Sequence, residues 1–494
     1  MRCPLVLNSS HPPNITDACA TLRSTSQRPR PRNTAPSRLD IKLTHFLFLC
    51  RGLLVSQSRL MGPLFRLLLR NGPRPVPVKP YSRIASATGA TVALSMAAYT
   101  CTVARRPSAE KTAVADAKAH HVTNWCGKTV KFRNPHPSHY DPKFLDFLGV
   151  FFKADDAPKT TSADEIVPVV KPHFLPARTS SPSLRATWLG HACYYVEYPS
   201  GLRVLFDPVF EDYCAPVPIP HLNRLTKRPC DIADIPFVDA VVISHSHYDH
   251  LSYPSIQEIR KSHPNAHFFV GLGLEKWFKQ SGIRNVTEMD WWDEIEVTFT
   301  PEAAKSDEVT GVEADSASRQ EPITATISCL PSQHASGRGM FDKNTTLWAS
   351  WGVRSGTPPD SKTVWFAGDT GYRTVPKVPE GVNDFGPDYQ ELPVCPQFRQ
   401  IGERLGSIDL GLIPIGAYAP RHVFSHMHAN PFDSVEIFRD TKCKRAMAIH
   451  WATWKLTPED PSEPPKLLRQ ALKRRGIAET GVFDICDVGE SREF

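Results

Sequence analysis

The 494-residue chain lacks several patterns that point to particular protein classes. Its twelve cysteines stand singly, with no C-x-x-C pair, which excludes a disulfide framework and a zinc ribbon. Residues 111–494 have no excess of basic side chains, since 42 Lys and Arg are outnumbered by 48 Asp and Glu. A basic surface is what nucleic-acid binding requires, so we predict no nucleic-acid partner for this part.

Acidic residues are absent from 41–109, and this absence marks a leader. Residues 1–110 hold 16 basic and 3 acidic side chains, so the net charge of +7 originates here. An Arg-rich, acid-free segment followed by Ser, Thr and Ala is typical of mitochondrial targeting. Residues 1–40 have a composition typical of disorder. We predict a disordered leader over 1–110 and a mitochondrial protein associated with the inner membrane.

One stretch of the leader is uncharged for 21 residues, 84–104 (IASATGATVALSMAAYTCTVA), and ends at Arg105 and Arg106. Its length is sufficient to cross a hydrocarbon core of about 30 Å. Ala, Thr and Ser dominate over Leu and Ile, so its hydrophobicity is low. Two interpretations stay open, a single weak transmembrane span or a continuation of the cleaved leader.

Strand-like apolar runs alternate with amphipathic segments from 184 to the C-terminus. LRATWLGHACYYVEY and LRVLFDPVF predict a β-hairpin, FVDAVVISHSH predicts a buried strand, and NPFDSVEIFRD predicts a helix capped by Asn430 with Pro431 at its first position. We predict an α/β layered sandwich over 184–494, with 111–183 as an extension packing on it. KFLDFLGVFFK (143–153) predicts a helix that covers the core or contacts a membrane surface, and 302–321 predicts a surface insertion.

Three histidines and an aspartate lie within six positions directly behind the apolar run VVIS. His245 and His247 are two residues apart, so both side chains project to the same side of an extended chain and can bind one ion. Asp249 and His250 fall where the chain turns, and they can face a second ion. Zinc accepts both imidazole nitrogen and carboxylate oxygen, usually with four ligands. The motif alone cannot fill two such sites, so other loops must contribute.

Further ligand types follow other apolar runs: His334 in LPSQH, Asp369 in FAGDT and His450 in AMAIH. Taken singly, such a histidine is more often a structural residue. Together they predict a site for two zinc ions, which would activate a water molecule near neutral pH. The expected division is His245, His247 and His334 on one ion, Asp249, His250 and His450 on the other, and Asp369 bridging them.

The phrases around these residues resemble a known family. TWLGHA, FDPVF, RPCDIADIPFVDAVVISHSHYDHL, FAGDTGY, PIGAY and AIHWATW are similar to the N-acyl-phosphatidylethanolamine-hydrolysing phospholipase D family of the metallo-β-lactamase superfamily. The resemblance runs from about residue 131 to 487. It implies a four-layer αββα sandwich, two zinc ions, and cleavage of a phosphodiester that releases N-acylethanolamine and leaves phosphatidic acid.

The resemblance also implies a functional histidine in FSHMHANPFDS, at His428, although Asn430 departs from the acidic residue of the family and His426 is a near competitor. We expect Asp249 and His428 to be catalytic, with His428 donating to a phosphate oxygen or to the leaving alkoxide. His191 and Asp207 either orient ligands or have a structural role. The expected partners are a phospholipid substrate and a membrane surface, and a homodimer is left open.

Two classes of alternative remain at this point. One is another hydrolase of the same fold, such as a thioesterase, a lactonase or a nuclease. The other is a membrane-tethered scaffold that kept the fold and lost the reaction. The metal motif by itself does not separate the hydrolases, whereas the presence of all seven ligand types argues against the scaffold.

Overall fold

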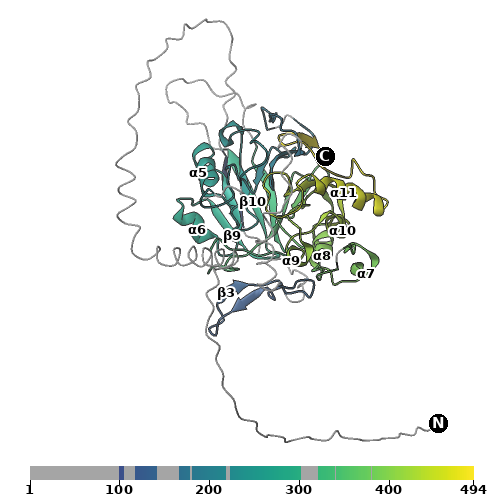
Figure 1. Ribbon diagram of the computed structural model, residues 1–494. Coiled ribbons are helices and arrows are strands. Elements are labelled where there is room, and N and C mark those ends of the chain that lie inside the picture. The colour runs from purple at the N-terminus through teal and green to yellow at the C-terminus, as the bar shows by residue number, and fades with distance from the viewer. Residues whose placement is uncertain are drawn as a thin grey trace, which may run out of the picture. The chain divides into compact units, whose positions relative to one another are not determined.

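The computed structural model describes residues 99–104, 117–141, 166–178, 181–218, 223–301, 321–339, 341–379 and 381–494. They belong to one compact unit, Ala93–Phe494. Two sheets lie in its middle, with α5 and α6 on one outer side and α8, α10 and α11 on the other (Figure 1). The predicted αββα layering is therefore confirmed.

The larger sheet has eight strands in the order β1–β10–β11–β12–β13–β14–β15–β16. In this order, each strand from β1 to β13 pairs antiparallel with the next, and each strand from β13 to β16 pairs parallel with the next. The bounds are β1 (Tyr99–Ala104), β10 (Glu294–Pro301), β11 (Ile323–Leu330), β12 (Ser350–Ser355), β13 (Lys362–Phe366), β14 (Ile408–Pro414), β15 (Cys443–Ile449) and β16 (Phe483–Asp484).

The second sheet has seven strands in the order β17–β4–β5–β6–β7–β8–β9, and its strands from β6 to β9 are parallel. The predicted hairpin contains three strands, because the chain also turns between β4 and β5. The bounds are β4 (Arg185–Gly190), β5 (Cys193–Glu197), β6 (Arg203–Phe206), β7 (Ala240–Val242), β8 (His267–Gly271), β9 (Val286–Met289) and β17 (Ser491–Glu493). A separate two-stranded hairpin consists of β2 (His121–Thr123) and β3 (Thr129–Phe132).

The helices cover the outer faces of the sheets. The predicted start of α10 is confirmed, since the Asn430 side chain accepts a hydrogen bond from the Asp433 backbone N–H and Pro431 is the first helical residue. The bounds are η3 (Ile232–Asp234), α5 (Tyr253–Ser262), α6 (Glu275–Gln280), α7 (Pro387–Gln390), α8 (Gln397–Leu405), α9 (Arg421–Phe424), α10 (Pro431–Thr441) and α11 (Glu463–Arg474).

The core explains why the strands read as continuous apolar runs. Every residue of β5 is buried. Tyr194 packs into the cluster between the two sheets, and Tyr195 packs into the cluster beneath α5 and α6. Successive side chains of a strand point to opposite faces, so a strand covered on both sides needs apolar residues at every position.

The prediction for 84–104 was wrong over its last six residues. Tyr99–Ala104 is β1, which pairs antiparallel with β10 at the edge of the large sheet, with Tyr99 opposite Pro301 and Ala104 opposite Glu296. The sandwich therefore begins before residue 111. Residues 84–98 lie outside the described part, and within that part no helix has the length and apolar character needed to span a bilayer.

Parts of the predicted extension 111–183 contact the sandwich. Arg178 binds both carboxylate oxygens of Asp239 at 2.7 and 2.8 Å, and Val169 forms a β-bridge with Val488. The predicted helix at 143–153 and residues 302–320 of the predicted insertion lie outside the described residues.

Candidate dinuclear metal centre

The predicted ligands lie at one edge of the sandwich. His245 follows β7, His334 follows β11, Asp369 follows β13 and His450 follows β15. The strands β11, β13 and β15 run in one direction, because β11 and β13 are both antiparallel to β12 and β13 to β15 are parallel. Their carboxyl ends therefore meet at one edge, which explains how His334, Asp369 and His450 converge although 116 positions separate the first from the last.

Three histidines form the first group. The Nε2 atom of His245 lies 2.8 Å from Nδ1 of His247, and that Nδ1 lies 3.2 Å from Nε2 of His334. Burial lowers the pKa of His245 and of His334 well below the usual value, and the neighbouring histidines lower both further. Neutral imidazoles are the form that binds a metal.

The second group combines two histidines with a carboxylate. Oδ2 of Asp249 lies 3.3 Å from Nε2 of His250 and 3.3 Å from Nε2 of His450. Burial alone would lower the pKa of His450, but Asp369 and Asp249 outweigh it and raise the pKa to about 9. The two carboxylates therefore favour a positive charge beside His450, which a proton or a metal ion can supply.

Asp369 lies between the two groups. Its Oδ2 is 3.0 Å from His450 Nε2 and 3.2 Å from His250 Nε2 on one side, and 3.6 Å from His334 Nε2 on the other. Its Oδ1 is buried and has no hydrogen-bond partner among the described residues. A buried carboxylate oxygen without a partner is costly unless it binds a cation. Five imidazoles and two carboxylates with facing lone pairs fit a pair of divalent ions.

Neighbouring residues orient the ligands by hydrogen bonds, and for three histidines these bonds use the ring nitrogen that does not face the cluster. Asp207 Oδ2 lies 2.6 Å from His250 Nδ1, Ser244 Oγ lies 2.9 Å from His245 Nδ1, and the Met427 carbonyl lies 2.9 Å from His334 Nδ1. His191 Nε2 lies 3.0 Å from Asp249 Oδ2. Such contacts orient a ligand and leave its other nitrogen free for a metal. Of the two interpretations of His191 and Asp207, these contacts favour ligand orientation.

The structure separates His428 from His426. Nδ1 of His428 lies 3.9 Å from Asp369 Oδ2, and burial lowers the pKa of His428 to about 4. The His426 ring packs against His139 with centroids 5.2 Å apart, and its backbone carbonyl accepts a hydrogen bond from the Gln333 side chain. His428 therefore faces the candidate metal centre, and His426 contacts the residues around it.

A cleft of about 640 Å³ opens beside the first group and is lined by His247, His334 and His428. Sequence reasoning missed Asn134, whose side-chain amide donates to the His334 carbonyl at 2.8 Å. It also missed Arg338, which donates to the carbonyls of Ser246 and Leu251 beside the histidine motif. The only sequence signal for Asn134 was the polar stretch RNPHPSHYDP.

The backbone of the site adopts conformations that most residues avoid. His191, Asp207 and His450 have positive φ angles of 52°, 37° and 64°. A non-glycine residue in this region costs about 1–3 kcal/mol and persists only where the surroundings hold it. Gly371 allows a second close approach, since a Cβ there would lie 2.6 Å from the His426 backbone. The Asp369 loop and the His428 loop are thereby pressed together.

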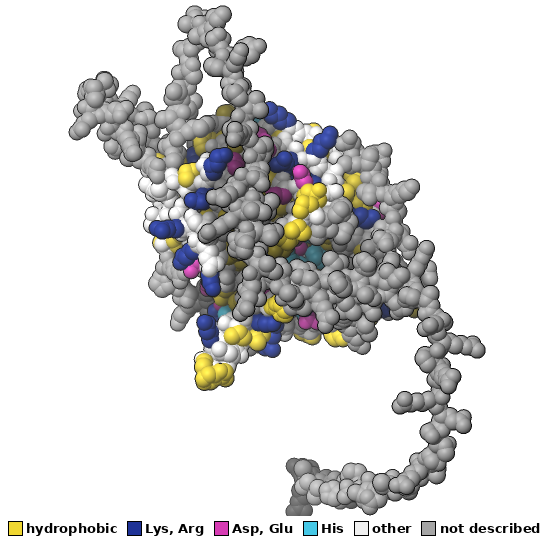
Figure 2. All heavy atoms as spheres, turned by 60° about the vertical axis from the view of Figure 1, so that its left-hand side comes forward, with side chains coloured by type: hydrophobic (Ala, Val, Ile, Leu, Met, Phe, Trp, Pro, Cys, Tyr) yellow, Lys and Arg dark blue, Asp and Glu magenta, His cyan; other side chains and the backbone are white. Residues whose placement is uncertain are grey.

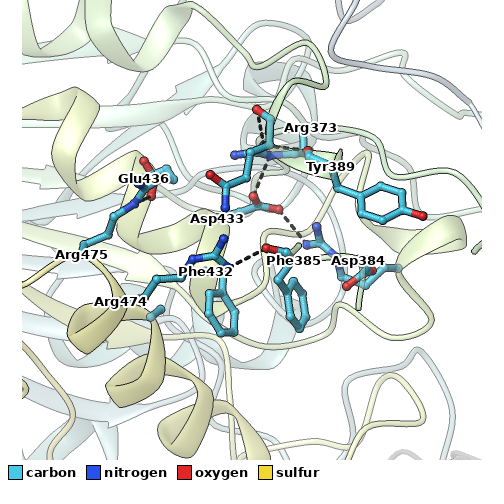
Figure 3. Close-up of a pocket in the computed structure, with 12 residues that line it drawn as sticks. Arg373, Asp384, Phe385, Tyr389, Phe432, Asp433, Glu436, Arg474 and Arg475 are labelled. Carbon is cyan, nitrogen blue, oxygen red and sulfur yellow. Dashed lines mark hydrogen bonds and ion pairs between the residues drawn. The ribbon is translucent and has the colours of Figure 1, made fainter. Parts of the chain in front are cut away.

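An ion-pair network ties these two loops to α10. Asp433 accepts from Arg421 Nη1 at 2.7 Å, and its other oxygen lies 2.9 Å from Arg373 Nε. Figure 3 shows the Asp433 carboxylate pointing towards Arg373 in a pocket of about 30 Å³, large enough for about one water molecule. Arg373 lies four residues after Asp369, and Arg421 begins the helix before His428. The pocket therefore supports the position of the two loops.

Comparisons with known proteins agree with this fold. The Beta-lactamase superfamily domain model matches residues 202–451. N-acyl-phosphatidylethanolamine-hydrolyzing phospholipase D 1 of Caenorhabditis elegans is 32% identical over 317 residues, which cover 63% of this chain and 76% of that protein. The mitochondrial N-acyl-phosphatidylethanolamine-hydrolyzing phospholipase D of Saccharomyces cerevisiae is 30% identical over 298 residues, which cover 60% and 52%.

Among solved structures, a metallo hydrolase from Ignicoccus hospitalis is 18% identical, with a TM-score of 0.38, and the match covers 63% of this chain and 98% of that one. The family model spans half of the chain, and the nematode relative is covered over more than two thirds of its length. The chain belongs to the beta-lactamase superfamily of metal-dependent hydrolases, in the branch whose members are named N-acyl-phosphatidylethanolamine-hydrolysing phospholipase D.

Proposed function

We propose that the chain is a zinc-dependent phosphodiesterase of the phospholipase D type, which hydrolyses N-acyl-phosphatidylethanolamine to N-acylethanolamine and phosphatidic acid. The observation that carries the proposal is the position of Asp369, whose Oδ2 lies within 3.6 Å of histidines from both groups. The names of the nematode and yeast relatives support the choice of substrate.

The proposed ligands are those expected from the sequence: His245, His247 and His334 for one zinc ion, Asp249, His250 and His450 for the other, and Asp369 for both. Two zinc ions would supply an activated water molecule and neutralise charge on the phosphoryl group. His191 Nε2 lies 3.0 Å from Asp249 Oδ2, the same oxygen that faces His250 and His450, and this contact orients the carboxylate. This contact limits the rotation of the carboxylate and so pre-organises the second group.

His428 is proposed to donate a hydrogen bond to a phosphoryl oxygen or to the leaving alkoxide. Because burial lowers its pKa to about 4, it is neutral at pH 7 and offers an N–H group without a positive charge. Its place on the wall of the cleft puts it where a phosphate diester would enter. The dipole of that N–H bond would favour the charge that develops during hydrolysis.

The proposed reaction is direct attack of water on phosphorus. The bond between phosphorus and the ethanolamine oxygen breaks, the leaving alkoxide takes a proton, and the oxygen of water remains on phosphatidic acid. No covalent phosphohistidine forms. Hydrolysis in ¹⁸O-labelled water should therefore place the label in phosphatidic acid, and label in N-acylethanolamine would contradict the proposed point of attack.

Two assays test the proposal against the alternatives. The pure protein should contain about two zinc ions per chain and should hydrolyse N-acyl-phosphatidylethanolamine. Activity on a glutathione thioester alone would show a different hydrolase of this fold. Less than about one zinc ion per chain after gentle purification would favour a scaffold that lost the reaction.

The proposed location is the mitochondrion, with association to the inner membrane. The acid-free leader supports targeting, and the yeast relative is named mitochondrial. N-terminal sequencing of the protein from isolated mitochondria tests it, because a processed N-terminus within 1–110 is expected. An unprocessed chain recovered only outside mitochondria would contradict it. Homodimerisation stays a prediction.

A further inference from the structure

The hairpin β2–β3 stands apart from both large sheets. Its two strands pair only with each other among the described strands, and it extends from the lower end of the body in Figure 1. Its base is anchored by Asp290, whose two carboxylate oxygens lie 2.8 Å from His120 Nε2 and 2.9 Å from His121 Nε2. The His120 ring also stacks on Trp291 with centroids 4.2 Å apart. The hairpin therefore has a rigid base.

The end of the hairpin combines exposed apolar and basic side chains. Trp125 is 95% exposed and Val122 is 36% exposed. Residues 117–133 contain four basic side chains and no acidic one, and Lys128 and Lys131 are exposed. Figure 2 shows yellow apolar and dark blue basic side chains together at this lower end of the molecule. An indole in water beside lysines is the composition of a segment that binds at a membrane interface.

The hairpin lies beside the mouth of the cleft that leads to the candidate metal centre. The Phe132 backbone N–H donates to the Asn344 carbonyl at 2.8 Å, and Asn344 lines the cleft. Two residues after β3, Asn134 binds the His334 carbonyl. The same rim includes Lys343, and the adjoining Phe341 is 81% exposed. The exposed Phe341 and the ion pair of Lys343 with Asp141 at 3.3 Å thus lie at this rim of the opening.

We propose that the β2–β3 hairpin docks the catalytic body on an anionic lipid bilayer, with Trp125 in the interface and Lys128 and Lys131 against lipid phosphates. This inference rests on the proposed function, because it names the surface from which that substrate would be taken. The argument is charge complementarity: Lys118 pairs with Asp290 at the base, whereas Lys128 and Lys131 have no acidic residue within the hairpin, although residues 111–494 carry a net negative charge. A bilayer attracts this edge and repels the remainder of the body.

The main test measures binding of the full chain to vesicles of equimolar phosphatidylcholine and phosphatidylglycerol by co-sedimentation. Trp125→Ser should weaken binding about 50-fold, since an indole half-immersed in lipid loses roughly 100 Å² of apolar burial. Replacing Lys128 and Lys131 by Gln should weaken it about fivefold for each lysine, and less on pure phosphatidylcholine. Both variants retain the leader, so the difference from wild type reports the hairpin.

A matched pair of valines supplies the control. Val122 in the hairpin and Val170 outside it are 36% and 40% exposed, so Val→Ser removes similar surface at both. Val122→Ser should weaken vesicle binding, and Val170→Ser should not. Equal binding by wild type and Trp125→Ser, or equal effects at the two valines, would overturn the proposal. A change in oligomeric state of Trp125→Ser with unchanged vesicle binding would identify a second copy of the chain as the partner instead, and would also overturn it.

Activity separates this inference from the proposed function. On N-acyl-phosphatidylethanolamine in vesicles Trp125→Ser should be slower than wild type, whereas on a short-chain substrate dissolved as monomers the two should be equal. If wild type hydrolyses neither substrate, the proposed function fails, and vesicle binding still decides the docking. A loss of activity on the monomeric substrate would show that the hairpin acts on the catalytic site and would contradict docking as its role.

Discussion

Replacing Asp207 with Asn should weaken metal binding by the second group of ligands. Asp207 Oδ2 lies 2.6 Å from His250 Nδ1 and accepts from Ser244 Oγ at 2.5 Å, while Oδ1 accepts from the Ser244 backbone N–H at 2.7 Å. A carboxylate accepts at both oxygens, so it keeps the His250 proton on Nδ1. Nε2, which points towards Asp249 and Asp369, is then the nitrogen that would give up its proton to bind a metal.

An amide at this position cannot make the same set of contacts. If the amide oxygen accepts from the Ser244 backbone, the NH₂ group faces His250 Nδ1 and favours the tautomer protonated at Nε2. That proton blocks the atom that would bind the metal. Loss of such an orienting partner typically lowers metal affinity about 10–100-fold, which corresponds to about 1.4–2.7 kcal/mol.

The assay is a zinc titration of the metal-free protein against a competing chromophoric chelator, with circular dichroism to check the fold. Asp239→Asn is the matched control, because Asp239 is also buried but binds Arg178 away from the site. It should lower the free energy of unfolding and leave the zinc affinity unchanged. Two zinc ions bound by Asp207→Asn with wild-type affinity would refute the reasoning about the tautomer.

Three further predictions address other parts of the molecule. Asp433→Asn removes the carboxylate shared by Arg373 and Arg421. Because Arg421 keeps its ion pair with Asp384 at 3.1 Å, the free energy of unfolding, measured by urea denaturation, should fall by about 3 kcal/mol, the lower end for a broken buried pair; a loss below about 1 kcal/mol would show that the pair is not needed. His428→Gln should slow hydrolysis about 10²–10⁴-fold with unchanged zinc content, and an unchanged rate would exclude the proposed hydrogen bond. Burial lowers the pKa of His267 to about 4. As the pH falls, His267 therefore binds a proton in the unfolded chain before it does so in the folded protein, and the free energy of unfolding decreases below about pH 6.5. Wild type should therefore lose about 2 kcal/mol more than His267→Asn between pH 7 and pH 5, and parallel curves would contradict it.

The sequence by itself determined the features that depend on local interactions. The start of α10 follows from two residues, since an Asn side chain can accept from a backbone N–H two or three positions on and Pro suits a first helical position. The strands were recognisable because those buried on both faces, such as β5, must be apolar throughout. The spacing of His245 and His247 brought their side chains to one side of the chain. Each of these conclusions depends on neighbours within a few residues.

Features that depend on residues distant in the sequence were decided only by the tertiary structure. An uncharged run of small residues suits both a weak membrane span and an edge strand, and only pairing with β10 made Tyr99–Ala104 a strand. The place of Asp369 between the two histidine groups, and the left-handed backbone of His450, require loops from several strand ends to hold one another. Asn134 reaches His334 across 200 positions of sequence. Such contacts arise from the order of strands in the sheets and from packing, and neither can be deduced from a short stretch of sequence.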